Sequence, residues 1–133
     1  KLGGADRSRK MSKTKAKIVA FVVDDDPAVR DSLRFSLELQ GLTAHTCSSG
    51  EGLLAHQALA ESDCIILDYK MPGMNGLDVL EELAAREVTT PVIFMTGPLT
   101  DAFRTRALNA GARLVLEKPL LDTLPDRIRD LIR

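Results

Sequence analysis

Five short apolar runs alternate with five amphipathic stretches along the 133 residues of the chain. Each run is rich in Val, Ile and Leu, and each stretch repeats its apolar residues at helical spacing. The runs predict strands over 18–23, 43–47, 64–67, 91–95 and 114–116. The stretches predict helices over 27–40, from 48 or 49 to about 60, and over about 75–86, 100–110 and 121–133. Because parallel strands need crossover connections, this alternation predicts a parallel sheet with helices on both faces.

The composition is that of a single folded domain with an aliphatic core. Hydrophobic residues make up 44% of the chain and aromatic residues only 4%, so Leu, Ile, Val and Ala must fill the interior. In the first predicted helix, Val29, Leu33 and Leu37 recur on one side, and Phe35 is a further candidate for that inner face. The two cysteines and two histidines lack the spacing of a zinc site.

The N-terminal segment differs from the rest of the chain in charge. Residues 1–17 carry seven Lys or Arg residues against one Asp, whereas the remainder has an excess of acidic residues. We expect residues 1–16 to be a disordered basic leader or an expression tail, and residues 17–133 to form the domain. The acidic body argues against direct binding of nucleic acid. With no membrane-length apolar run and no apolar signal region, we expect a cytoplasmic protein without membrane contact.

Polar side chains follow four of the five predicted strands, at the edge where open α/β sheets place their sites. They are Asp24, Asp25 and Asp26 after the first strand, Asp68 after the third, Thr96 after the fourth, and Glu117 and Lys118 after the fifth. Each one alone has a structural explanation, since the first three could cap the following helix and a surface Lys before Pro is common. Their joint position at one sheet edge favours a functional site.

The residue types at this edge suit phosphoryl transfer. Clustered carboxylates repel one another unless a cation lies among them, and hard oxygen ligands without His or Cys indicate Mg²⁺ or a similar ion. A divalent ion, a hydroxyl and an ammonium group around one further carboxylate can neutralise phosphoryl oxygens. Asp68 is central among these groups, so it is the candidate nucleophile that would form an aspartyl phosphate.

The segments VVDDD, ILDYKMPGMNG, FMTG and LEKP, in this order, resemble the receiver domain of two-component response regulators. The resemblance covers about residues 17–133, and the opening VVDDDPAVRDSL is similar to the FixJ-type branch. It implies a flavodoxin-like (βα)5 fold: a doubly wound, five-stranded parallel sheet with strand order 2-1-3-4-5. It also implies a phosphoacceptor signalling switch, not an enzyme in the usual sense, since such a domain catalyses only its own phosphorylation and dephosphorylation.

The resemblance further implies a Mg²⁺ site. Asp25 would bind the metal directly and Asp24 mainly through water, while Asp68 would both ligate the metal and accept the phosphoryl group. The backbone carbonyl of Tyr69 would supply another metal oxygen.

Other residues take supporting roles by the same resemblance. Thr96 and Lys118 would each bind a phosphoryl oxygen, and Gly97 would leave room for the phosphodonor. The bond from Lys118 to Pro119 is expected to be cis, and Gly76 would permit the tight turn after the site.

The partners implied are a sensor histidine kinase, or a small donor such as acetyl phosphate, and an output domain or effector protein. Phosphorylation would change the surface formed by the fourth helix, fifth strand and fifth helix, which could also form a phosphorylation-dependent homodimer.

Three positions depart from the family pattern or flank the site. Many members carry Phe or Tyr where this chain has Val115, and that ring moves as the Thr moves. Val115 either packs the fifth strand, with output carried by backbone shifts, or coupling from Thr96 is weakened or rerouted. Lys70 and Pro98 flank the acceptor site, and shielding by Lys70 predicts slow autodephosphorylation.

Other classes of protein fit the sequence less well. A haloacid-dehalogenase-like phosphatase also uses Asp and Mg²⁺, and Asp24 with Asp26 resembles its signature, but Pro27 and Ala28 do not and a cap domain is lacking. A nucleotide-binding module would need a glycine-rich phosphate loop, which is missing. A degenerate receiver is disfavoured because every reactive position is filled.

Overall fold

The computed structural model describes residues 17–119 and 123–132. The predicted leader over 1–16 and the first residues of the last predicted helix therefore lie outside the described residues, and the division into leader and domain stays a prediction. Within the described ranges, no helix combines the length and apolar character needed to cross a membrane.

Five parallel strands form one sheet in the order β2-β1-β3-β4-β5. This confirms the predicted doubly wound fold and its strand order. The strands are β1 (Val19–Val23), β2 (Thr43–Cys47), β3 (Cys64–Asp68), β4 (Val92–Thr96) and β5 (Leu114–Glu117). All residues of β3 and β4 are buried, as expected for central strands covered on both faces.

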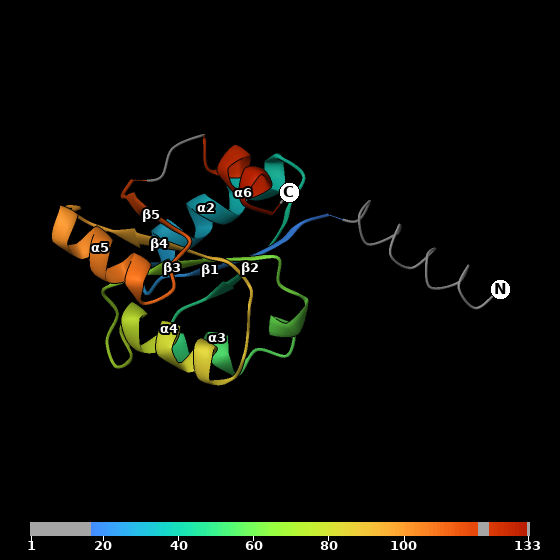
Figure 1. The fold of residues 1–133 in the computed structure, drawn as a ribbon. Helices are drawn as coiled ribbons and strands as arrows, with labels where there is room; N and C mark the ends of the chain where they lie inside the picture. Colours follow the sequence, from blue (N-terminus) through green and yellow to red (C-terminus); the bar gives the residue numbers. More distant parts are fainter. Residues whose placement is uncertain (1–16, 120–122, 133) are drawn as a thin grey trace.

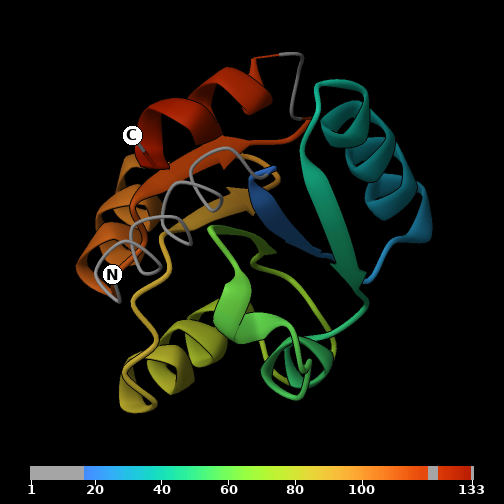
Figure 2. The same cartoon turned by 90° about the vertical axis from the view of Figure 1, so that its right-hand side faces the viewer.

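Helices lie on both faces of the sheet (Figure 1). They are α2 (Pro27–Leu39), α3 (Gly50–Leu54), α4 (Gly76–Ala85), α5 (Asp101–Asn109) and α6 (Leu124–Ile132). One core cluster joins α2 and α6 to the sheet, and a second joins the sheet to α3, α4 and α5. Figure 2 shows the same layers after a quarter turn, with α2 and α6 on one side of the sheet and α3 and α4 on the other.

Side-chain caps define where the helices begin. Asp26, Ser49, Asn75 and Thr100 each accept a backbone N–H bond at a helix N-terminus, and Asn75 forms a reciprocal capping box with Asp78. Three of these caps agree with the predicted helix starts. For Asp26, helix capping was the structural alternative to a role in the functional site. Its side chain does cap α2, accepting the backbone N–H of Ala28.

The predicted helix from 48 or 49 to about 60 is wrong in its second half. The α-helix ends at Leu54, and only a 3-10 turn, η1 (Leu59–Glu61), follows. His56 explains the break, because its Nδ1 accepts the backbone N–H of Ala58 at 3.0 Å and so replaces a helical bond. The ring of His56 also packs edge-on against Phe21, with centroids 4.9 Å apart.

Phe35 is not on the inner face of α2 as expected. It is 68% exposed, whereas Leu33 and Leu37 are buried, so only the latter two belong to the core. The helical period explains this, since Phe35 lies about 200° around the helix from both of those residues.

Candidate functional site

Asp68 is the last residue of β3, the middle strand of the sheet. It is buried, with only 4% of its surface exposed. Its neighbour in the sheet is Met95, the residue before Thr96, so the ends of β3 and β4 reach the same edge. A carboxylate buried at this point needs a compensating charge or hydrogen-bond donor.

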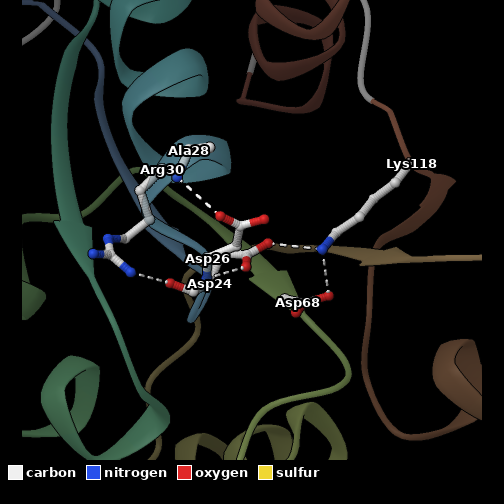
Figure 3. A network of polar contacts seen from close by, with 6 residues as sticks. All are labelled: Asp24, Asp26, Ala28, Arg30, Asp68 and Lys118. Carbon is white, nitrogen blue, oxygen red and sulfur yellow. Dashed lines mark hydrogen bonds and ion pairs between the residues drawn. The ribbon is translucent and has the colours of Figure 1, made fainter.

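Lys118 supplies that charge. Its Nζ lies 3.1 Å from Oδ1 of Asp68 and 2.8 Å from Oδ2 of Asp24. Figure 3 shows the lysine reaching from the end of β5 to a point between the two carboxylates. The bond from Lys118 to Pro119 is cis, as expected, and the backbone N–H of Lys118 donates to the Thr96 carbonyl at 2.7 Å.

Asp24 is fully buried and held on several sides. Its Oδ1 accepts the backbone N–H of Asp26 at 2.9 Å, and its own N–H donates to the Cys47 carbonyl at 3.1 Å. The Arg30 side chain, from α2, donates to the Asp24 carbonyl at 2.8 Å (Figure 3). The start of the loop after β1 is therefore fixed by bonds to β2, to α2 and within the loop itself.

The electrostatics of the site reflect this crowding. Burial raises the pKa of Asp68 above its ordinary value; the hydrogen bond from Lys118 opposes the rise, and the charge of Asp24 adds to it. Burial alone would lower the pKa of Lys118, but its hydrogen bonds to Asp24 and Asp68 outweigh burial and raise that pKa. The lysine is thus held in its charged form beside the two carboxylates.

Three carboxylates meet at this edge of the sheet. Asp24, Asp25 and Asp68 each offer an oxygen, and these oxygens lie within 4.8 Å of one another. Asp25 is exposed, so the cluster is open to solvent on one side. A set of hard oxygen ligands without nitrogen or sulfur fits the preferences of Mg²⁺.

The remaining predicted residues lie around this cluster. Thr96 ends β4 and is 8% exposed. The Tyr69 carbonyl accepts the backbone N–H of Gly76 at 2.9 Å. Gly97 is exposed, and a Cβ added there would have no atom within 4 Å, so the space beside the site is open.

The role expected for Gly76, to permit the tight turn after the site, is not the one observed. The positive φ of the loop after β3 is at Gly73, with φ +78°, and not at Gly76. Gly76 is instead the first residue of α4, where a Cβ would lie 2.2 Å from the Phe94 ring and 2.9 Å from the Asp68 carbonyl oxygen. It is needed for close packing between α4 and the sheet, directly behind the acceptor candidate.

Two shallow hollows flank the site. One, of about 400 Å³, is lined by the segment that follows Asp68: Tyr69, Lys70, Met71, Pro72 and Asn75. The other, of about 480 Å³, lies between the first turns of α2 and the end of β5 and includes Lys118 in its wall.

Sequence reasoning missed one residue of the site. Arg30 contacts Asp24 through a backbone carbonyl, and its residue type does not distinguish it from the exposed Arg34 on the same helix. Its position one turn into α2, six residues after Asp24, is the only available signal.

Taken together, the fold and the site define a doubly wound α/β protein with an acidic, cation-suited site beyond its central strand. Residues 20–132 match the family described as the response regulator receiver domain. The chain is 41% identical over 103 residues to the C4-dicarboxylate transport transcriptional regulatory protein DctR of Rhodobacter capsulatus, covering 76% of this chain and 52% of that protein.

A second relative and a solved structure agree with this match. The chain is 42% identical over 101 residues to the transcriptional regulatory protein FixJ of Azorhizobium caulinodans, covering 76% of this chain and 48% of that protein. A CheY-like receiver domain protein from Methanospirillum hungatei JF-1 superposes with a TM-score of 0.78 at 26% identity, covering 88% of this chain and 94% of that one.

The chain therefore belongs to the receiver-domain family of two-component response regulators, and its relatives include FixJ. It is a signalling domain, as the resemblance implied. The chain spans about half the length of the curated relatives it matches.

Proposed function

We propose that Asp68 accepts the phosphoryl group of this receiver domain. The observation that carries the proposal is the burial of Asp68 at the end of the central strand, between the carboxylates of Asp24 and Asp25 and the ammonium group of Lys118. A carboxylate oxygen of Asp68 would attack phosphorus, and the bond from phosphorus to the donor would break. The leaving group, an imidazole or acetate, would keep the electron pair of that bond.

The surrounding residues would stabilise charge during this transfer. Mg²⁺ held by Asp24, Asp25, Asp68 and the Tyr69 carbonyl would supply electrostatic stabilisation of the phosphoryl oxygens. Lys118, which is already within 3.1 Å of Asp68, would bind one phosphoryl oxygen. The hydroxyl of Thr96 would donate to another oxygen from the end of the neighbouring strand.

The biological partners follow from the family and stay proposals. The donor would be a sensor histidine kinase, with acetyl phosphate as a small-molecule substitute. The phosphorylated domain would act on an output domain or effector, or pair with a second copy, through the surface of α5, β5 and α6. We propose no direct contact with nucleic acid or membrane, and the cytoplasmic location stays a prediction.

The proposal is tested by incubating the protein with acetyl phosphate and Mg²⁺ and measuring its intact mass. We expect one added phosphoryl group in wild type, none in Asp68→Asn, and none when EDTA replaces Mg²⁺. Asp31→Asn is the matched control, because Asp31 is an exposed carboxylate on α2. Equal labelling of wild type and Asp68→Asn would overturn the assignment.

A further inference from the structure

Helix α5 is anchored to the body of the protein by very few side chains. Ala107 is fully buried and Phe103 is partly buried, and every other residue of the helix is exposed. These two residues are four positions apart, so they form one narrow inner face. Ala107 offers only a methyl group, which leaves Phe103 as the main side-chain contact of the N-terminal half of the helix.

The ring partners of Phe103 come from the region of the acceptor candidate. Its ring lies 4.8 Å from that of Tyr69 and 5.7 Å from that of Phe94, measured between centroids. Tyr69 and Phe94 are themselves 6.1 Å apart, in an edge-to-face arrangement. All three separations fall in the range of favourable aromatic pairs. We call Tyr69, Phe94 and Phe103 the aromatic triad.

Tyr69 places one ring of the triad directly beside the site. It follows Asp68 in the chain, its N–H donates to the Met95 carbonyl at 3.0 Å, and its carbonyl accepts the Gly76 N–H at 2.9 Å. The backbone of Tyr69 is therefore fixed to β4 through its N–H and to α4 through its carbonyl. A displacement of the Asp68 peptide must move the Tyr69 ring or strain these two bonds.

The position on β5 next to the triad holds no ring. Val115 is 2% exposed and pairs with Phe94 in the β4–β5 register. The ring contacts between the site and α5 are therefore made by Tyr69, in the loop after β3, and by Phe94 on β4, and not by β5.

We propose that the contact between Tyr69 and Phe103 couples the state of Asp68 to the position of α5. The proposal rests on the proposed phosphorylation of Asp68. A phosphoryl group adds charge and volume beside the Tyr69 peptide, and the displaced ring changes the contact that holds the N-terminal half of α5. Tyr69 is thus a positioning residue for α5, besides the metal role proposed for its carbonyl.

The test is hydrogen exchange of the α5 backbone, followed by mass spectrometry, with and without acetyl phosphate and Mg²⁺. In wild type we expect phosphorylation to change the exchange of residues 101–109. In Phe103→Leu this change, per phosphorylated molecule, should shrink by about two- to tenfold, the equivalent of losing the aromatic pair of Phe103 with Tyr69. Tyr69→Leu should reduce the response similarly, and the double variant should reduce it no further.

Two controls separate the ring contact from a general loss of structure. Phe103→Tyr keeps the ring and should keep the response, and Phe35→Leu removes an exposed ring on α2 and should change nothing. Uptake of phosphate by Phe103→Leu, read from intact mass, shows that this variant is folded.

The outcomes of these measurements distinguish the coupling from the phosphorylation of Asp68 itself. A full wild-type response in Phe103→Leu, or equal loss in Phe103→Tyr, would overturn the coupling while leaving Asp68 as acceptor. A phosphorylated wild type without any change in α5 would do the same. No phosphate uptake by wild type would remove both the proposed function and this inference.

Discussion

Arg30 holds the backbone carbonyl of Asp24 and so helps to position the loop that carries the clustered carboxylates. Its bond to the Asp24 carbonyl, 2.8 Å long, joins α2 to the loop that holds two of the three clustered carboxylates. A hydrogen bond from a charged donor is stronger than one between neutral groups, and here it is partly buried. Arg34, four residues further on, makes an exposed pair with Glu38 and serves as a matched control.

We predict that Arg30→Ala lowers the free energy of unfolding by about 1–2 kcal/mol, because the Asp24 carbonyl loses a charged donor. It should also slow phosphate uptake from acetyl phosphate, since Asp24 is less well placed. Urea denaturation and intact-mass time courses measure the two effects. Arg34→Ala should change stability by no more than about 0.5 kcal/mol. Equal effects of the two substitutions would show that Arg30 is an ordinary surface residue.

The residues of the site were predictable to different degrees. Asp24 and Lys118 follow strands and Asp68 ends one, so a parallel sheet brings them to one edge by topology alone. Their pairing was not predictable, because the sequence does not show that Lys118 bonds both carboxylates. Arg30 was missed because its partner is a backbone carbonyl, which leaves no trace in residue type.

Among the elements, α4 and β4 lie in close contact behind the site. The first residue of α4, Gly76, lies against the Phe94 ring, and Gly50 similarly makes room for Val79 between α3 and α4. Glycine at these points lets helix and sheet approach closely at a small cost in backbone entropy.

We predict that Gly76→Ala lowers the free energy of unfolding by about 1–3 kcal/mol, because its Cβ would overlap the Phe94 ring. Gly97→Ala is the control, since it also adds one methyl group near the site but meets no atom within 4 Å. Thermal and urea unfolding measure both variants. A Gly76→Ala protein as stable as Gly97→Ala would contradict the close packing derived for α4.

The elements were predictable where periodicity and capping agreed. The strands and the starts of α2, α4 and α5 follow apolar runs and capping residues, and they were predicted within one or two residues. The predicted helix after Ser49 was too long because the chain leaves the helix after Leu54, where a His side chain, not Gly or Pro, accepts the backbone N–H of Ala58. The prediction of an inward Phe35 is wrong because it rests on apolar character alone, and the helical period places this residue on the outer face of α2.

The molecule as a whole gathers negative charge at one end of its sheet. Three carboxylates each place one oxygen within 4.8 Å of the others. The ammonium group of Lys118 pairs with two of these carboxylates. Repulsion among the carboxylates destabilises the fold, so a cation that binds only the folded state should stabilise it.

We predict that Mg²⁺ raises the unfolding midpoint, with a stabilisation of about 1.4 kcal/mol at ten times its Kd. The effect should disappear with EDTA and in Asp25→Asn, which removes the exposed ligand of the cluster. Differential scanning fluorimetry across Mg²⁺ concentrations measures it, with Asp31→Asn as control. If Asp25→Asn responded to Mg²⁺ as wild type does, the three carboxylates would not form the metal site.

The most direct test of the account locates the phosphoryl group on the chain. Wild-type protein is phosphorylated with acetyl phosphate and Mg²⁺ and then reduced with borohydride, which converts an aspartyl phosphate to homoserine. Peptide sequencing by mass spectrometry then identifies the altered residue. We expect homoserine at position 68 and unmodified Asp24. Homoserine at position 24, with Asp68 intact, would contradict the assignment of Asp68 as the acceptor and would indicate phosphatase-like chemistry instead.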